Sequence, residues 1–143
     1  MKAGRPHRIP LSDDAVKILE ALPRMRERVF PAPRGGVMSD MTITAVIRRM
    51  HEANIKAGGD GYTDPNQGHN TVTAHGFRSA FKDWARSCTA FADEVSELAL
   101  AHVASDATRA AYARDELIEQ REALMADWAR FLAQPIEKGR EAL

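Results

Sequence analysis

The chain has 143 residues, equal numbers of basic and acidic side chains, and 44% hydrophobic residues. These values are typical of one globular domain that is large enough to bury a core. Its single cysteine, Cys88, excludes an intramolecular disulfide and a zinc site of several cysteines, and it favours a reducing compartment. No apolar run approaches the ~20 residues of a membrane span, and no signal-peptide pattern follows Met1. The sequence therefore predicts a cytoplasmic protein without a membrane partner.

The two parts of the chain differ in charge. Residues 1–90 hold 14 basic and 9 acidic side chains, whereas residues 91–143 hold 6 and 11. A basic face and an acidic tail can coexist in one domain, and the local field matters more to a nucleic-acid partner than the sum. Charge scattered over a solvated surface explains the same counts, so charge alone does not identify the partner.

The first predicted elements are a brief strand and a helix. Residues 7–12 (HRIPLS) are expected to form a short strand that leads to Ser12, an N-cap followed by Asp13 and Asp14 in the first helical turn. Apolar residues at helical spacing continue this helix until Pro23 ends it. A lone strand is not stable in water, so residues 7–12 lack the neighbouring strand that they need.

A second helix follows a loop. Residues 29–36 are predicted to form a Pro/Gly loop, and Ser39 or Asp40 opens the next helix. The apolar residues of that helix form one stripe, which consists of Ile43, Val46, Ile47 and Met50. Residues 57–72 hold four glycines and a proline, and they are expected to form a long loop of the kind that is often functional or mobile.

The second half is predicted to be helical. Residues 73–87 form a helix that is anchored in the core by an apolar arc of Phe77, Phe81 and Trp84. Further helices are expected in residues 93–102, in a short segment capped by Ser105 and Asp106 that carries Tyr112, and in residues 115–133. The predicted fold class is mainly α.

Three polar side chains on these helices are candidates for a site. His75 and Arg78 lie three residues apart, so they project from neighbouring points of one helix face, although two solvated surface residues would do the same. His102 ends a helix and, taken alone, is better explained as a partly buried histidine near a helix C-terminus, where a positive charge is favourable. A metal site made of His69, His75 and His102 is not expected, because carboxylate or cysteine partners at ligand spacing are missing.

Tyr112 lies between Arg109 and Arg114. A phenol with a pKa of about 10 is protonated at neutral pH, so a tyrosine nucleophile needs help. Nearby cations stabilise a phenolate and also bind a phosphodiester. Arginine, lysine and histidine side chains converging on Tyr112 would make a phosphoryl-transfer site without a metal, whereas a tyrosine that packs on its own helix would need no such explanation.

The order of these residues resembles the catalytic domain of the tyrosine recombinases, in particular the integrases of temperate and satellite phages and genomic islands. The resemblance runs from Lys2 to about Leu132 and rests on the stretches TAHGFRSAFKDWA (73–85), ELALAH (97–102), AAYAR (110–114) and EALMADWARFL (122–132). It implies a mainly α fold that keeps, at its N-terminus, a remnant of the family's small β-sheet. Residues 1–134 would be the catalytic domain and residues 135–143 a polar tail.

The resemblance also implies a role for each motif residue in a DNA breaking and rejoining enzyme of a prophage or other mobile genetic element. Tyr112 would attack the scissile phosphate and form a 3′-phosphotyrosyl link, and Lys2 would protonate the leaving 5′-oxygen. Arg78 would hold the non-bridging oxygens, His75 would transfer a proton, and His102 would hydrogen-bond the phosphate. The enzyme would need no cofactor and no metal, and it would act as a homo-tetramer on double-stranded attachment sites.

Two features depart from the family's pattern. The family's L-G-H reads Leu100-Ala101-His102 here, which exchanges one small residue for another. The family's first catalytic arginine precedes the hairpin lysine, but this sequence starts at Met1-Lys2. A truncated product, a prophage remnant and a misassigned start codon are all compatible with this start. Because one missing transition-state donor costs ~10²–10³ in rate, the resemblance implies a folded but catalytically feeble chain.

Other functions are consistent with the same residues. A non-catalytic DNA-binding remnant would use basic side chains on the DNA backbone, the candidates being Arg48, Arg49, Lys82 and Arg86. An enzyme similar to type IB topoisomerases would share the tyrosine chemistry but relax supercoils without sequence preference. A purely structural helical domain would lose nothing when Tyr112, Arg78 and His102 are replaced.

Overall fold

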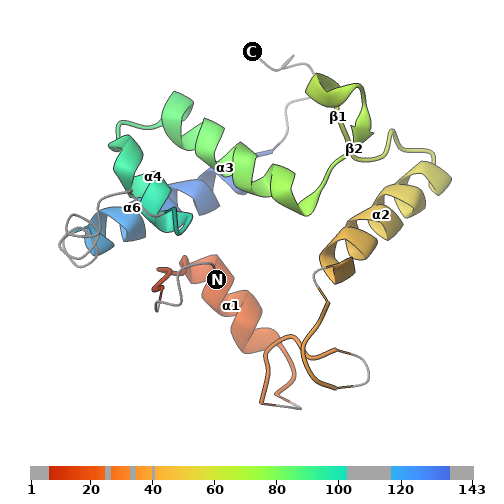
Figure 1. The fold of residues 1–143 in the computed structure, drawn as a ribbon, viewed down its shortest axis with the longest axis horizontal. Coiled ribbons are helices and arrows are strands. Elements are labelled where there is room, and N and C mark those ends of the chain that lie inside the picture. Colours follow the sequence, from red (N-terminus) through yellow and green to blue (C-terminus); the bar gives the residue numbers. More distant parts are fainter. Residues whose placement is uncertain (1–6, 25–26, 33–34, 40, 103–116, 136–143) are drawn as a thin grey trace. The chain divides into compact units, whose positions relative to one another are not determined.

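The computed structural model describes residues 7–24, 27–32, 35–39, 41–102 and 117–135. In this part of the chain there are five α-helices, one 3-10 helix and a two-stranded antiparallel sheet (Figure 1). The prediction of a mainly α fold with a small sheet is confirmed. The chain divides into two compact units: a middle unit, Leu22–Phe81, and a terminal unit made of Met1–Ala21 and Lys82–Leu143.

Helix α1 (Asp13–Ala21) opens the terminal unit, and its start is determined by the cap that the sequence predicts. The Ser12 hydroxyl accepts a hydrogen bond from the Ala15 amide at 3.3 Å, and the Ser12 carbonyl accepts one from the Val16 amide at 3.0 Å. The helix ends at Ala21, two residues before Pro23, because the residue before a proline avoids the helical conformation.

Residues 7–12 do not form the predicted strand, so the small sheet lies elsewhere than expected. The segment instead contacts two later helices of the terminal unit. The His7 ring lies 3.4 Å from the Ala99 carbonyl, and the Arg8 carbonyl accepts a hydrogen bond from Arg121 Nη1 at 2.8 Å. A strand without a neighbour has no ladder to satisfy its backbone, and the Arg121 contact satisfies one of its carbonyls.

Helix α2 (Met41–Lys56) belongs to the middle unit and starts after Ser39. The Ser39 hydroxyl accepts from the Met41 amide at 3.3 Å, which makes Ser39 the cap. The predicted apolar stripe is present on this helix but mostly faces solvent. All residues of α2 are described, and Ile47 alone is buried, whereas Ile43, Val46 and Met50 are exposed.

The sheet lies in residues 57–72, which the sequence predicts to be a loop. Strand β1 (Thr63–Asp64) pairs with β2 (Asn70–Thr71), Thr63 opposite Thr71 and Asp64 opposite Asn70, around a 3-10 turn, η1 (Pro65–Gln67). The Asp64 carboxylate caps that turn by accepting from the Asn66 amide at 2.9 Å. Side-chain capping of a turn stabilises this short hairpin, and strand propensity is not its signal.

The loop before the hairpin is fastened to α2. The Asn54 side-chain oxygen accepts from the Gly61 amide at 2.7 Å, and His51 Nδ1 accepts from the Tyr62 amide at 2.9 Å. Gly61 has a φ of 73°, and a Cβ on it would lie 2.6 Å from the His51 ring. Only glycine fits there, because both the left-handed backbone and the close approach exclude a side chain.

Helix α3 (Ala74–Cys88) runs from the middle unit into the terminal unit, which begins again at Lys82. Of the predicted anchoring arc, Phe81 and Trp84 are buried, but Phe77 is 63% exposed, so the expectation that Phe77 anchors the helix is wrong. The first turn of α3 leaves the Phe77 ring in solvent, and burial begins one turn later at Phe81.

The core of the terminal unit lies between α4 (Asp93–Ala99) and α6 (Ile118–Leu132), which pack against each other (Figure 1). Val95 from α4 and Leu124 from α6 are fully buried, and the other buried apolar residues in the described part of this unit are Trp84, Ala85 and Ala99. Burial of apolar surface in this core supports the end of α4, where a candidate site residue lies.

Candidate active site

His75 and Arg78 lie in the first two turns of α3, where they share one face. The helix start is fixed by Thr73, whose hydroxyl accepts from the Gly76 amide at 3.2 Å. His75 is exposed and Arg78 is half-buried. An imidazole and a guanidinium are therefore presented from one helix, as the H-x-x-R spacing predicts.

His102 follows α4 in a tight helix-ending turn. Its amide donates to the Glu97 carbonyl at 2.9 Å, and the Ala101 amide donates to the Leu98 carbonyl at 3.1 Å. These are the two hydrogen bonds of a Schellman motif, and the motif requires a left-handed residue, here Ala101 with a φ of 55°. Glycine, which the resembled family's L-G-H has at this position, adopts this conformation without strain. Alanine in place of glycine at position 101 therefore strains the backbone.

The Glu97 side chain links His102 to a buried lysine. One carboxylate oxygen, Oε2, accepts from His102 Nδ1, and the other, Oε1, lies 2.6 Å from Lys82 Nζ. Lys82 is only 8% exposed and also contacts Asp93 Oδ1 at 2.8 Å and Ser96 Oγ at 2.7 Å. We call Lys82, Asp93, Ser96 and Glu97 the lysine cluster.

The lysine cluster keeps its two carboxyl groups ionised. Hydrogen bonds from Arg86 and then Lys82 hold the pKa of the Asp93 carboxyl far below its usual range. For Glu97, burial works to raise the pKa, but hydrogen bonds from Lys82 and His102 outweigh it and the pKa is lowered. Both carboxylates therefore act as acceptors near neutral pH.

Of the four basic residues predicted to contact the DNA backbone, two are held by carboxylates. Lys82 belongs to the lysine cluster, and Arg86 Nε lies 2.8 Å from Asp93 Oδ1. Arg48 and Arg49 lie exposed on α2. The buried ammonium of Lys82 is a poor candidate for a DNA phosphate, because contact would require breaking its ion pairs with α4.

Two of the predicted catalytic residues, Lys2 and Tyr112, lie outside the described residues. His102 belongs to the terminal unit, while His75 and Arg78 belong to the middle unit. The structure adds Glu97 as a partner of His102, which the sequence does not single out. The sequence pattern that could have indicated this role is a glutamate near the end of a predicted helix, five residues before a candidate histidine.

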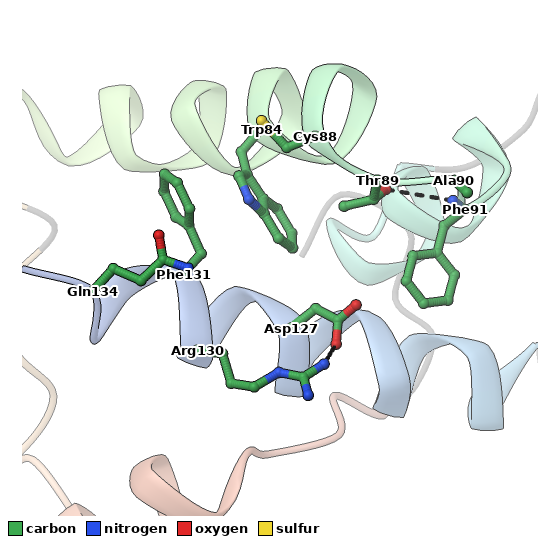
Figure 2. A pocket seen from close by; sticks show the side chains of 9 residues that line it. All are labelled: Trp84, Cys88, Thr89, Ala90, Phe91, Asp127, Arg130, Phe131 and Gln134. Carbon is green, nitrogen blue, oxygen red and sulfur yellow. Dashed lines mark hydrogen bonds and ion pairs between the residues drawn. The ribbon is translucent and has the colours of Figure 1, made fainter. Parts of the chain in front are cut away.

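A pocket in the described part of the terminal unit is not made of these residues. It has a volume of about 640 Å³ and lies between the end of α3 and α6 (Figure 2). Trp84 and Phe131 line it, with ring centroids 5.7 Å apart, and Trp128 lies 4.9 Å from Trp84. The other lining residues are Cys88, Thr89, Ala90, Phe91, Asp127, Arg130 and Gln134. Of the described candidates, His75, Arg78 and His102 do not line this pocket.

Two kinds of feature are missing from the described residues. They contain no group of three or more histidine, cysteine or acidic side chains that could hold a metal ion. Within the same ranges, no helix is both long and apolar enough to cross a membrane.

The chain is similar to two curated proteins of Escherichia coli (strain K12). It is 34% identical to prophage integrase IntA over 134 residues, which cover 90% of this chain and 28% of IntA. It is 27% identical to prophage integrase IntZ over 130 residues, which cover 90% of this chain and 29% of IntZ. The chain thus spans less than a third of the length of these relatives. No family model and no solved structure matches it.

Proposed function

Because this chain belongs to the phage integrase family of tyrosine recombinases, we propose that it is a catalytic domain that cleaves and rejoins DNA at attachment sites. Residues 1–134 form this domain, and residues 135–143 are a polar tail. The observation that carries the proposal is the order of its motifs, H-x-x-R, L-x-H and tyrosine, within a match to IntA that covers 90% of the chain.

The chemistry assigns one task to each motif residue. The Tyr112 oxygen attacks the scissile phosphorus, the bond to the 5′-oxygen breaks, and a 3′-phosphotyrosyl link forms. His75 takes the phenolic proton, and Lys2 gives a proton to the departing 5′-hydroxyl. When a 5′-hydroxyl later attacks the phosphotyrosyl link, the same steps run in reverse and the tyrosine is released. The phosphodiester energy is conserved, so the reaction needs neither ATP nor a cofactor.

Charge stabilisation is the task of Arg78 and His102. Negative charge on the non-bridging oxygens grows toward the transition state, and preorganised donors lower that barrier more than donors that must first be ordered. The local geometry supports these roles. Arg78 lies half-buried on the rigid helix α3, and His102 is fixed at the backbone by the Schellman motif.

Double-stranded DNA is the proposed partner, and a homo-tetramer on two duplexes is the proposed assembly, acting in the cytoplasm. The exposed Arg48 and Arg49 of α2 are the stronger candidates for contacts to the DNA backbone, since Lys82 and Arg86 are paired with carboxylates. Such contacts release counterions, so affinity would fall steeply with salt.

These 143 residues supply no counterpart of the family's first arginine. We therefore expect the chain by itself to cleave DNA ~10²- to 10³-fold more slowly than a protein that contains this donor.

Covalent trapping on a nicked suicide duplex of the attachment site tests the proposal. Two proteins are compared: this chain, and a chimera in which it replaces the matching segment of IntA. The expected result is a denaturant-resistant protein–DNA band that is strong with the chimera, weak with the chain, and absent after Tyr112→Phe. Tyr62→Phe is the matched control, because Tyr62 is the only other tyrosine of the chain.

Three results would contradict the proposal and identify an alternative. DNA binding without any covalent band would indicate a non-catalytic remnant. Relaxation of supercoils without sequence preference would indicate an activity similar to that of type IB topoisomerases. A protein that neither binds nor cleaves DNA would be a structural helical domain.

A further inference from the structure

We propose that Glu97 is a positioning residue for His102: it fixes the imidazole with Nδ1 toward its carboxylate and leaves Nε2 for a DNA phosphate. That His102 binds a DNA phosphate rests on the proposed function, whereas the contacts between Glu97 and His102 are taken from the structure. The sequence resemblance assigns no role to Glu97, and the structure joins this residue to His102 at two points.

The first point is the backbone. The Glu97 carbonyl accepts the His102 amide at 2.9 Å, which closes the helix-ending turn. The second is the side chain, where Glu97 Oε2 accepts from His102 Nδ1. An imidazole held at both its backbone and one ring nitrogen has little freedom left, so less entropy is lost when it engages a phosphate.

Glu97 is itself held in place by Lys82. The ammonium of Lys82 is nine-tenths buried and has three protons, and its three close side-chain contacts are Glu97 Oε1, Ser96 Oγ and Asp93 Oδ1. The ammonium also donates to the Asp93 carbonyl at 3.3 Å, but a Glu97 carboxylate that turned away would lose its ion pair with this buried charge, which is costly. This contact keeps Oε2 directed at His102.

The pairing determines which ring nitrogen carries the proton. An ionised carboxylate only accepts, so Nδ1 must be the donor, and in the neutral ring Nε2 then has no proton. When the ring is protonated, Nε2–H becomes a donor on the side away from Glu97. The His102 side chain is 47% exposed, so a phosphate oxygen has access to it.

The variant Glu97→Gln distinguishes positioning of His102 from a purely structural role, in which Glu97 would only stabilise the end of α4. The amide has one accepting oxygen and one donating NH₂ group. Lys82 can only donate, so it takes the oxygen, and the NH₂ group is left facing His102 Nδ1. Nδ1 must then accept, and the proton of the neutral ring must move to Nε2. This near-isosteric change inverts the tautomer while preserving the fold.

The experiment is ¹⁵N NMR of the imidazole nitrogens of the 143-residue chain, recorded at a pH where the ring is neutral. Nδ1–H is expected for His102 in the wild type and in Glu94→Gln, an exposed control on the same helix, and Nε2–H is expected in Glu97→Gln. An Nε2–H wild type, or a tautomer that does not change in Glu97→Gln, would overturn the proposal.

The IntA chimera then links the tautomer to the reaction. In Glu97→Gln, single-turnover cleavage should slow by about 10-fold, as for other residues that orient a functional histidine, while the Kd for DNA stays unchanged. An inverted tautomer with an unchanged cleavage rate would also overturn positioning. Failure of the proposed function gives a different result, because no chimera would cleave DNA although the tautomers behave as expected.

Discussion

Helices α2 and α6 are nearly equal in length, 16 and 15 residues, and both have an apolar side, but they differ in what covers it. In α6, Leu124 is fully buried against α4, in a core that also holds Val95. In α2, Ile47 is buried while Ile43 remains 55% exposed. The difference teaches that apolar periodicity predicts a helix and the face it would bury, whereas burial also requires a partner element.

The largest effect is expected from truncating that core. Leu124→Ala removes a fully buried side chain and should lower the free energy of unfolding by about 2–5 kcal/mol. Ile43→Ala, on the exposed stripe of α2, should change it by no more than about 0.5 kcal/mol. Urea unfolding followed by circular dichroism measures both. Equal losses would contradict the comparison and mean that the stripe of α2 is covered in solution.

A smaller effect on the free energy of unfolding is expected in the middle unit, at the loop that packs closely on α2. Gly61→Ala and Gly58→Ala both place a side chain on a left-handed backbone, which costs about 1–2 kcal/mol each. Only at Gly61 does the new Cβ also meet the His51 ring and Ile55, whereas at Gly58 nothing lies within 4 Å. Overpacking should make Gly61→Ala the worse variant by about 1–3 kcal/mol.

Amide hydrogen exchange at Tyr62 reports this difference locally, because that amide donates to His51. Faster exchange in Gly61→Ala than in Gly58→Ala is the expected result. The same exchange rate in both variants would show that the loop does not pack on α2 as closely as the distances indicate.

In the terminal unit, Ala101→Gly should increase stability. The left-handed conformation at the end of α4 costs alanine about 1–2 kcal/mol, and glycine removes this cost. Glycine also raises the conformational entropy of the unfolded chain, which destabilises the fold by about 0.4–1 kcal/mol. The net gain should be about 0.5–1 kcal/mol in urea unfolding. Destabilisation by glycine would mean that Ala101 does not adopt this conformation in solution.

The smallest effect concerns the dependence of stability on pH. The pKa of Asp93 is lower in the folded chain than in the unfolded one, so its interactions stabilise the fold above the unfolded pKa of about 3.9 and are lost as pH falls through the folded value. Asp93→Asn should therefore be less stable than the wild type at neutral pH. The difference should shrink in strong acid, and urea midpoints across this range check it. A difference that grows in acid would contradict the sign.

Sequence could predict the features that depend on local chemistry. Ser12 and Ser39 start helices because their hydroxyls accept nearby amides, and the H-x-x-R spacing places His75 and Arg78 on one face through helix geometry alone. These relations involve residues within one or two turns of each other, which is the range over which a pattern is informative.

The rest depends on contacts between elements. The sequence suggests a surface charge at Lys82, but Asp93 and Glu97 of another helix surround it. It suggests a core residue at Phe77, but among the described residues that ring is mostly exposed. The hairpin at residues 63–71 is stabilised by the Asp64 cap, not by alternating apolar residues. The role of Glu97 follows only from the geometry of His102 and Lys82 together.

The aromatic cluster beside the pocket gives the chain an optical probe of its own. Trp84 and Trp128 are the only tryptophans of the chain, and their rings lie 4.9 Å apart across α3 and α6. All indole fluorescence of the protein thus originates from one junction between two helices. A change in emission on adding DNA or a second protein reports on that junction alone, and the spectrum requires no label.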